Sequence, residues 1–319
     1  MNSENLVFAI DTSNYTTSVA ILDTYGNLVA NLKKPLAVKQ GERGLRQSDA
    51  LFAHIQNIPV LMREARAYLD GRQIVAVGVS DKPRNVEGSY MPCFLGGVSA
   101  AESIASALGV KLYRFSHQCG HIMAALYSSR AEKLLCEQFA AFHISGGTTE
   151  LLRVNPVDNG FDTELIGRTL DLNAGQIIDR VGVYMGLKFP AGSEMEALAL
   201  TNTKKIPTHK ICIKDMSVNL SGLENLAVKL YDKTSDKPLV SAFVLDYISR
   251  AVFAMSSAYE EAFGKARFVY AGGVMSNSII KENLKKSFDA YFAEPAMSAD
   301  NAVGIAVLTL RAYKSEKRL

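Results

Sequence analysis

The chain contains two similar segments, each made of an apolar run, a small polar turn and a second run. Residues 5–10 (NLVFAI) lead through the turn DTSNYTT into SVAILD, and residues 138–144 (QFAAFHI) lead through SGGTT into ELLRVN. Short apolar runs joined by turn residues are typical of β-hairpins. We therefore predict that each half of the chain opens with a β-hairpin whose tip is small and rich in hydroxyl groups.

Further strands and helices follow each predicted hairpin. In the first half, IVAVGVS and KLYRFS read as strands on either side of a helix across GVSAAESIASALG. In the second half, ARFVYAGGV reads as a strand whose glycines lead into a helix from about Asn277. A hairpin tip of small residues exposes backbone N–H groups that suit phosphate oxygens. One alternative is that both tips are merely tight turns in an unrelated α/β protein.

The duplicated layout resembles the actin-like ATPase superfamily. This resemblance implies an α/β, actin-like (ASKHA) fold of two related ribonuclease-H-like domains with a nucleotide and metal cleft between them. We expect residues 1–130 to form the first domain and residues 131–300 the second, with a C-terminal helix (301–319) packing back on the first. The 48% hydrophobic and 21% charged residues agree with a soluble globular protein that has a full core.

Charge and cysteine content exclude few functions. The net charge of +3 comes without a dense Lys/Arg block, so it neither predicts nor excludes a nucleic-acid partner. The four cysteines contain no CxxC pair, which favours free thiols in a reducing compartment. The N-terminus lacks a basic leader followed by an apolar stretch, and we find no apolar run of the roughly 18 residues that a membrane helix needs. We therefore expect a cytoplasmic protein without a membrane partner.

The segment HQCGH places His117 and His121 four residues apart. On a helix these positions share one face, so both side chains can meet one metal ion. A zinc protease of the HExxH type needs a glutamate as general base where this chain has Gln118, so protease chemistry is excluded by that route. Asp300 is a candidate third ligand, because two histidines and one carboxylate form a common open metal site. The alternatives are a chance histidine pair on a partly buried helix and an aspartate that only caps the last helix.

Six motifs occur in an order and spacing that resemble the TsaD family of tRNA threonylcarbamoyl transferases. They are HxxxH at 117–121, SGGTT at 145–149, AGQIIDRVGVYMGLKFPAG at 174–192, SGLEN at 221–225, AGGVMSN at 271–277 and ADNAVGIA at 299–306. The likeness extends over almost the whole chain. It implies transfer of a threonylcarbamoyl group from threonylcarbamoyl-adenylate to N6 of the adenosine at position 37 of tRNA.

The resemblance also implies ligands for each motif. His117, His121 and Asp300 would bind one divalent metal ion, iron or zinc, and the second half would bind ATP or an adenylate. The residues expected at the acyl-phosphate portion are Ser145, Gly146, Gly147, Thr148 and Thr149. Those expected around the ribose and adenine are Asp179, Gly192, Glu196, Gly272, Gly273 and Asn277.

Some of these residues have purely structural alternatives. Asp179 could pair with Arg180 or cap its helix, and Gly192 could be an ordinary turn glycine. Glu196 could be a solvated residue on a helix face, and Asn277 could only cap the helix that follows the glycine pair.

The chain departs from the family pattern on the side expected to meet the acceptor. Tyr15 and Thr16 stand where the family has two adjacent acids, and Thr148 stands where it has a histidine. Cys119 replaces an acid within the histidine motif. Asp11 is retained in place of a glutamate, and we take it as the candidate catalytic residue.

These departures keep two other functions open. One is a non-catalytic scaffold similar to the family's inactive partner subunit, although such a scaffold has no need of three metal ligands. The other is a carbamoyl transferase that acts on a small-molecule acceptor. The expected partners are tRNA and subunits similar to TsaB and TsaE, in a homodimer or a heterodimer.

Overall fold

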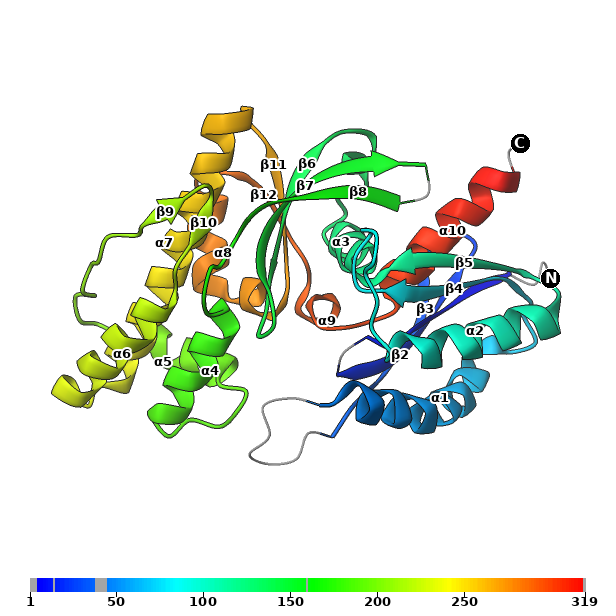
Figure 1. The fold of residues 1–319 in the computed structure, drawn as a ribbon, viewed down its shortest axis with the longest axis horizontal. Helices are drawn as coiled ribbons and strands as arrows, with labels where there is room; N and C mark the ends of the chain where they lie inside the picture. The colour runs from blue at the N-terminus through cyan, green and yellow to red at the C-terminus, as the bar shows by residue number, and fades with distance from the viewer. Residues whose placement is uncertain (1–4, 14, 38–44, 159, 318–319) are drawn as a thin grey trace. The chain divides into compact units, whose positions relative to one another are not determined.

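The computed structural model describes residues 5–13, 15–37, 45–158 and 160–317. Asn14 of the first predicted hairpin tip and the last two residues of the predicted C-terminal helix lie outside this set. The chain divides into two compact units (Figure 1). Unit 1 comprises Met1–Glu132, Pro156–Asp162 and Ala299–Leu319, and unit 2 comprises Lys133–Asn155 and Thr163–Ser298.

Unit 1 is built on a five-stranded sheet with the order β3-β2-β1-β4-β5. Its strands are β1 (Leu6–Asp11), β2 (Thr16–Asp23), β3 (Leu28–Pro35), β4 (Ile74–Lys82) and β5 (Lys111–Ser116). β1 and β2 form the predicted antiparallel hairpin, while β1, β4 and β5 run parallel. The carboxyl ends of β1 and β5 therefore lie at the same edge of the sheet, where ligands bind in open α/β sheets.

Helices cover both faces of the unit 1 sheet. They are α1 (Gln47–Leu69), α2 (Phe94–Leu108), α3 (His117–Ser128) and α10 (Val303–Lys317). Apolar side chains of β1, including Phe8 and Ile10, form a core with α1 and α2, which lie side by side (Figure 1). On the other face α10 lies directly on β4, because a Cβ at Gly78 would come 1.9 Å from the Thr309 hydroxyl.

Unit 2 repeats the same sheet. Its strands are β6 (Phe139–Ile144), β7 (Thr149–Val157), β8 (Gly160–Arg168), β11 (Arg267–Ala271) and β12 (Asp289–Phe292), in the order β12-β11-β6-β7-β8. β6 and β7 are antiparallel, while β6, β11 and β12 are parallel. In both units the first strand is central, flanked by the second and third on one side and by the fourth and fifth on the other. The predicted duplicated α/β fold is thereby confirmed.

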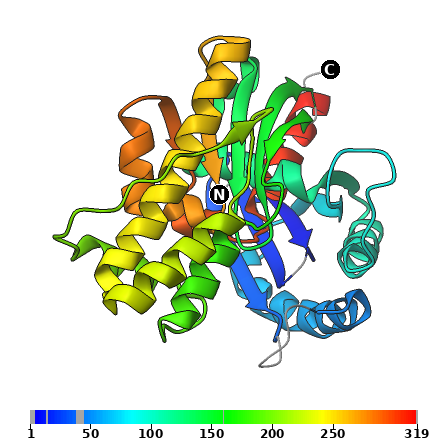
Figure 2. The same cartoon turned by 60° about the vertical axis from the view of Figure 1, so that its left-hand side comes forward.

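The helices of unit 2 gather around one long apolar helix. They are α4 (Ala174–Tyr184), α5 (Gly192–Leu200), α6 (Ser221–Thr234), α7 (Lys237–Phe263), α8 (Ser278–Lys285) and α9 (Pro295–Ser298), with short elements η1 (Glu132–Cys136), β9 (Ile213–Lys214), β10 (Ser217–Val218) and η2 (Gly273–Ser276). By length and composition alone α7 could cross a membrane, but 78% of its most apolar window is buried. It packs against α5, α6 and α8 (Figure 2), so we interpret it as the core helix of this unit.

Candidate functional site

Two histidines occupy the first turns of α3, at the carboxyl edge of the unit 1 sheet. β5 ends at Ser116, whose hydroxyl accepts a hydrogen bond from the Cys119 N–H (3.2 Å) and caps α3 just before His117. The four-residue spacing puts His117 and His121 on one face, with their ring centroids 4.3 Å apart. Each ring directs Nε2 toward the same carboxylate oxygen, Oδ1 of Asp300.

Asp300 approaches both histidines from the segment before α10. Its Oδ1 lies 3.3 Å from His121 Nε2 and 3.6 Å from His117 Nε2. The three potential ligand atoms lie within 4.8 Å of one another. The side chain of Asn301, not that of Asp300, accepts a hydrogen bond from the Val303 N–H (3.0 Å) at the start of α10. The carboxylate of Asp300 is thus left to face the histidines.

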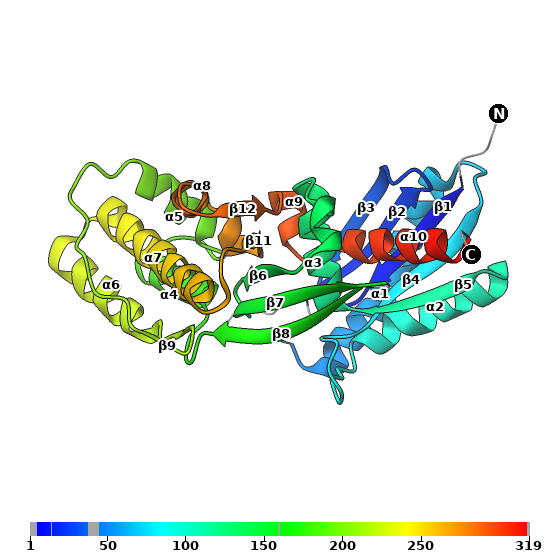
Figure 3. The same cartoon turned by 90° about the horizontal axis from the view of Figure 1, so that it is seen from above.

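Two glycines bring α3 and α10 close enough for this arrangement. A Cβ at Gly304 would come 1.8 Å from the carbonyl oxygen of Gly120, which lies between the two histidines. The two helices lie side by side (Figure 3). Gly304 follows Asp300 by four residues, so this contact sets how near the carboxylate comes to the histidines.

The charges at this cluster favour a bound cation. Burial raises the pKa of Asp300, but the hydrogen bonds and charges of His117 and His121 outweigh it and hold that pKa well below its usual range. Burial lowers the pKa of His117, but the neighbouring Asp11 outweighs it and raises that pKa to about 10. Burial and the charge of His117 lower the pKa of His121. A positive charge is therefore held between two carboxylates, and two imidazole nitrogens with one carboxylate oxygen fit iron or zinc.

Asp11 lies at the end of β1 with its side chain 1% exposed. One carboxylate oxygen lies 2.7 Å from His117 Nδ1, and the other accepts a hydrogen bond from the Ser13 N–H (2.7 Å). Burial raises the pKa of Asp11, but the charge and hydrogen bond of His117 outweigh it and lower that pKa. Both oxygens of this carboxylate are thus occupied within the protein.

Cys119 lies in the histidine motif but not in the cluster of candidate metal ligands. Its thiol is buried and contacts the carbonyl oxygen of Phe161 (3.6 Å). Burial raises the pKa of this thiol, so it stays protonated near neutral pH. These surroundings favour a packing role for Cys119 over a ligand role.

The rest of the first hairpin tip is anchored to the helices of unit 1. The Thr12 hydroxyl donates to the carbonyl oxygen of Cys93 (3.0 Å) and accepts from the Gly97 N–H (3.1 Å). Thr17 Oγ1 lies 2.9 Å from Nδ1 of His54, which is fully buried on α1. His54 could not be predicted from the sequence, because a single buried histidine has no local pattern.

Lys33 is a second residue that the sequence analysis missed. In the register of the sheet Asp11 pairs with Ser18, and Ser18 pairs with Lys33, so the three residues share one face. Burial lowers the pKa of Lys33, while the charge of Asp300 acts in the opposite direction. Lys33 therefore places a partly buried cation on the face where Asp11 meets the candidate metal ligands. Only its position within the strand could have pointed to it.

The second hairpin tip, residues 145–149, sits against the start of α4 in unit 2. The Ser145 N–H donates to the Thr148 carbonyl (2.8 Å) and closes the turn. The Thr149 hydroxyl accepts from the Ala174 N–H (3.0 Å), and the Gly175 N–H donates to the Ser145 carbonyl (3.2 Å). The tip is thereby fixed beside a helix N-terminus, which favours anions.

Glycines at the tip and in the turn after β11 fall into two kinds. Gly272 has φ +95°, and a Cβ there would come 2.2 Å from the Ile144 carbonyl, so the fold requires glycine. By contrast, a Cβ at Gly146, Gly147 or Gly273 would meet nothing within 4 Å, and these three have no positive φ. Packing of the described residues does not explain why these three are glycines, whereas a ligand close to the backbone would.

Asp179 and Gly192 lie together where α4 meets α5. Asp179 Oδ1 accepts a hydrogen bond from the Ala191 N–H (2.8 Å), which fixes the start of α5. Burial raises the pKa of Asp179. A Cβ at Gly192 would lie 4.0 Å from Ile178, so this position is not crowded. Arg180, the alternative partner of Asp179, instead pairs with Glu224 on α6 (3.0 Å).

Glu196 and Asn277 connect α5 to the start of α8. Glu196 Oε1 accepts from the backbone N–H (2.8 Å) and the hydroxyl (2.5 Å) of Ser278. Asn277 Oδ1 accepts from the N–H groups of Ile279 and Ile280, both at 3.1 Å, so Asn277 does cap α8. These contacts complete a ring of neighbouring elements in unit 2. The hairpin tip contacts α4, α4 contacts the start of α5, and α5 contacts the start of α8. The glycine turn that leads into α8 in turn contacts the end of β6 beside the tip. All the predicted nucleotide-binding residues belong to this ring.

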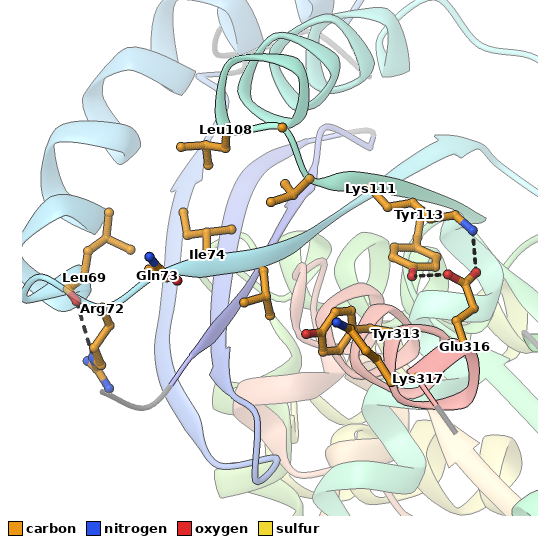
Figure 4. A pocket seen from close by; sticks show the side chains of 13 residues that line it. Leu69, Arg72, Gln73, Ile74, Leu108, Lys111, Tyr113, Tyr313, Glu316 and Lys317 are labelled. Atoms are coloured by element: carbon orange, nitrogen blue, oxygen red, sulfur yellow. Dashed lines mark hydrogen bonds and ion pairs between the residues drawn. The ribbon is translucent and has the colours of Figure 1, made fainter. Parts of the chain in front are cut away.

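A separate pocket of about 770 Å³ opens in unit 1, where the strands β4 and β5 begin (Figure 4). Tyr113 donates to Glu316 Oε2 (2.9 Å), and Lys111 pairs with the other oxygen of the same carboxylate. The candidate metal ligands His117, His121 and Asp300 lie instead near the ends of β1 and β5. We do not assign the function to this pocket, because none of the candidate site residues lines it.

Comparisons with known proteins agree with the motifs. The profile of the TsaD family, tRNA N6-adenosine threonylcarbamoyltransferase, matches residues 29–307. The enzyme of that name from Streptococcus suis is 29% identical over an alignment 330 positions long, gaps included, which covers 99% of this chain and 95% of the relative. The enzyme from Aromatoleum aromaticum is 28% identical, covering 94% of this chain and 89% of the relative.

Solved structures support the fold. A phosphate- and nucleotide-bound HypF superposes with a TM-score of 0.59 at 14% identity over 98% of this chain, although the chain spans only 47% of that HypF. Component A of (R)-2-hydroxyglutaryl-CoA dehydratase from Acidaminococcus fermentans gives a TM-score of 0.58 at 14% identity and covers 98% of this chain and 99% of that protein. The neighbours have actin-like folds, as the duplicated hairpins predict. Because the family profile spans most of its length, the chain belongs to the TsaD family of tRNA N6-adenosine threonylcarbamoyltransferases.

Proposed function

We propose that this chain transfers a threonylcarbamoyl group from threonylcarbamoyl-adenylate to N6 of the adenosine at position 37 of tRNA, using one divalent metal ion. The observation that carries the proposal is the convergence of His117, His121 and Asp300 at the carboxyl edge of the unit 1 sheet. A set of three protein ligands leaves positions open for a substrate oxygen.

The metal ligands have defined roles in this proposal. A bound ion would polarise the carbonyl group under attack. When the ion binds, both histidines would supply neutral nitrogens, so His117 would give up the proton that Asp11 favours. Asp300 would supply the negative charge that balances part of the charge of the ion. The helix start fixed by Ser116 and the glycine contact between α3 and α10 hold these three side chains together.

The ring of contacts in unit 2 supports binding of the adenylate portion. The tip at residues 145–149 lies beside the N-terminus of α4, so we assign the phosphate group to it. The space above Gly146 and Gly147 allows a phosphate to approach the backbone. We assign the ribose to Asp179, whose second carboxylate oxygen can accept from a hydroxyl group while the first accepts from the backbone of α5.

One observation favours a second candidate function. Tyr15 and Thr16, not acids, stand at the start of β2, and the carboxylate of Asp11 is buried. A chain that lacks these acids could use the same metal and adenylate to transfer the group to a small-molecule amine. The donor side would be unchanged, and only the acceptor would differ.

A direct test combines metal analysis with product analysis. The purified protein and a His117→Ala, His121→Ala double variant are assayed for iron and zinc, then incubated with threonylcarbamoyl-adenylate and unmodified tRNA. The reaction is run with and without subunits similar to TsaB and TsaE. Nucleosides from the digested tRNA and the small-molecule products are both measured by mass spectrometry.

The outcomes separate the candidates. Metal bound by the parent and lost in the variant, with threonylcarbamoyladenosine formed only by the parent, supports the proposal. Metal-dependent breakdown of the adenylate, with transfer to an added amine but never to tRNA, would favour the small-molecule acceptor. A parent that binds the adenylate but no metal would refute the catalytic proposal and leave the scaffold role.

A further inference from the structure

We propose that Asp11 is a positioning residue that holds His117 in the tautomer able to bind the metal, and that it does not contact the substrate. This inference rests on the proposed metal site and assigns a role to a residue outside the ligand set. The pairing links the end of β1 to the start of α3, residues that are 106 positions apart in the chain.

The carboxylate of Asp11 is held at both oxygens. Asp11 Oδ2 lies 2.7 Å from His117 Nδ1, while Oδ1 accepts the Ser13 N–H at 2.7 Å. The side chain is 1% exposed, so a substrate cannot reach it without displacing protein atoms. Because each oxygen already has a partner, the carboxylate cannot rotate without losing both hydrogen bonds.

This carboxylate determines which imidazole nitrogen of His117 carries the proton. A carboxylate only accepts hydrogen bonds, so the nitrogen that faces it must carry the hydrogen. Neutral His117 beside Asp11 therefore has its hydrogen on Nδ1 and its lone pair on Nε2. The Nε2 atom is the one directed at Asp300, 3.6 Å from its Oδ1. Asp11 thus selects both the orientation of the ring and the nitrogen that is free to bind a cation.

The substitution Asp11→Asn is expected to reverse the tautomer of His117. The Ser13 N–H still needs an acceptor, so the amide oxygen of the new side chain turns toward Ser13. The NH₂ group then faces His117 Nδ1 and makes that nitrogen an acceptor, which moves the hydrogen to Nε2. Hydrogen on Nε2 blocks the lone pair that the metal needs. Asp11→Ala, in contrast, enforces neither tautomer.

The test is the affinity of the full-length protein for Zn²⁺, measured by competition with a chelator, and the absorption spectrum of the Co²⁺ form. We expect Asp11→Asn to weaken Zn²⁺ binding by about 10- to 100-fold, the usual cost of losing a carboxylate behind a histidine ligand. We expect Asp11→Ala to weaken binding no more than Asp11→Asn does. Thermal unfolding of both variants checks that they remain folded.

Ser18→Ala is the matched control. Its hydroxyl donates to the backbone carbonyl of Asp11 (3.3 Å), so the change disturbs the same strand and leaves the carboxylate in place. We expect its Zn²⁺ affinity to stay within about twofold of the parent, because no side chain at the metal site changes.

The results separate this inference from the proposed function. If the parent binds Zn²⁺ and Asp11→Asn binds it within threefold of the parent, the positioning role is wrong and the metal site stands. An Asp11→Ala variant that binds Zn²⁺ more weakly than Asp11→Asn would also refute it, because that order indicates simple packing. If the folded parent binds no metal, the proposed metal site itself fails.

Discussion

The contact between α3 and α10 gives the strongest prediction about the candidate metal ligands His117, His121 and Asp300. In Gly304→Ala the new Cβ would come 1.8 Å from the Gly120 carbonyl oxygen, 2.7 Å from the Gly120 carbonyl carbon and 2.8 Å from the Ala124 nitrogen. All three are backbone atoms, so no side-chain rotation relieves the clash. An ordinary contact needs more than 3 Å, and α10 must therefore move by about 1 Å or more.

Gly304→Ala is expected to lower both the stability of the fold and the affinity for Zn²⁺. Forcing extra volume into a packed core costs about 1–3 kcal/mol, and we expect the upper end because the obstacle is backbone. A loss of about 3 kcal/mol lowers the melting temperature of a domain of this size by roughly 6–12 °C. Metal sites tolerate distance errors of about 0.2 Å, so a shift of Asp300 away from His117 and His121 should weaken Zn²⁺ binding more than about tenfold.

Gly222→Ala provides a matched control within the same chain. Gly222, like Gly304, is the second residue of its helix, but it is exposed and a Cβ there would meet nothing within 4 Å. We expect this variant to be more stable than the parent by up to about 1 kcal/mol, with unchanged Zn²⁺ affinity. Both variants are compared by calorimetry and by chelator competition. Parent-like stability and affinity in Gly304→Ala would refute the close packing of α3 and α10.

Three further predictions concern other parts of the molecule. Burial lowers the pKa of His54 to about 4, so stability is fully present above about pH 6.5, where this histidine is neutral in both the folded and the unfolded state, and about 3 kcal/mol of it is lost as the pH falls to 4. In urea unfolding across this pH range, the free energy of unfolding should fall less steeply with decreasing pH in His54→Gln than in the parent. An equal dependence on pH in the two proteins would contradict the prediction. Gly147→Ala should leave the melting temperature unchanged but weaken adenylate binding in calorimetric titration, and equal affinity would argue against a phosphate at the tip. Asn277→Ala should destabilise the protein by about 1 kcal/mol in urea unfolding through loss of a cap, while Asn277→Asp should retain most of that stability.

The sequence predicts those features that have a local pattern. Apolar runs with small turns identify both hairpins, and the four-residue spacing of His117 and His121 places them on one helical face. Two copies of one strand pattern also indicate two copies of one sheet, which the common strand order of the units confirms. Helix starts at Ser116 and Asn277 follow from side chains that accept backbone hydrogen bonds.

Features that depend on distant parts of the chain could not be predicted in this way. The pairing of Asp11 with His117 and the contact of Gly304 with Gly120 have no local signal, because both depend on how β1, α3 and α10 pack. For Asp300, the residues alone left both a metal ligand and a helix cap open. The cap of α10 turns out to be Asn301, which no pattern in the segment distinguished from its neighbour.

Glycines offer an independent argument that unit 2 binds a ligand. Packing requires glycine at Gly175 and Gly272, where a Cβ would strike backbone atoms at less than 3 Å. The exposed positions Gly146, Gly147 and Gly273 have no such requirement, and a residue with a side chain would cost the fold less entropy there. The presence of glycine at three open positions, two in the tip and one in the turn after β11, is explained if another molecule comes close to the backbone there. The open positions therefore support the proposed binding of a phosphate at the tip of unit 2.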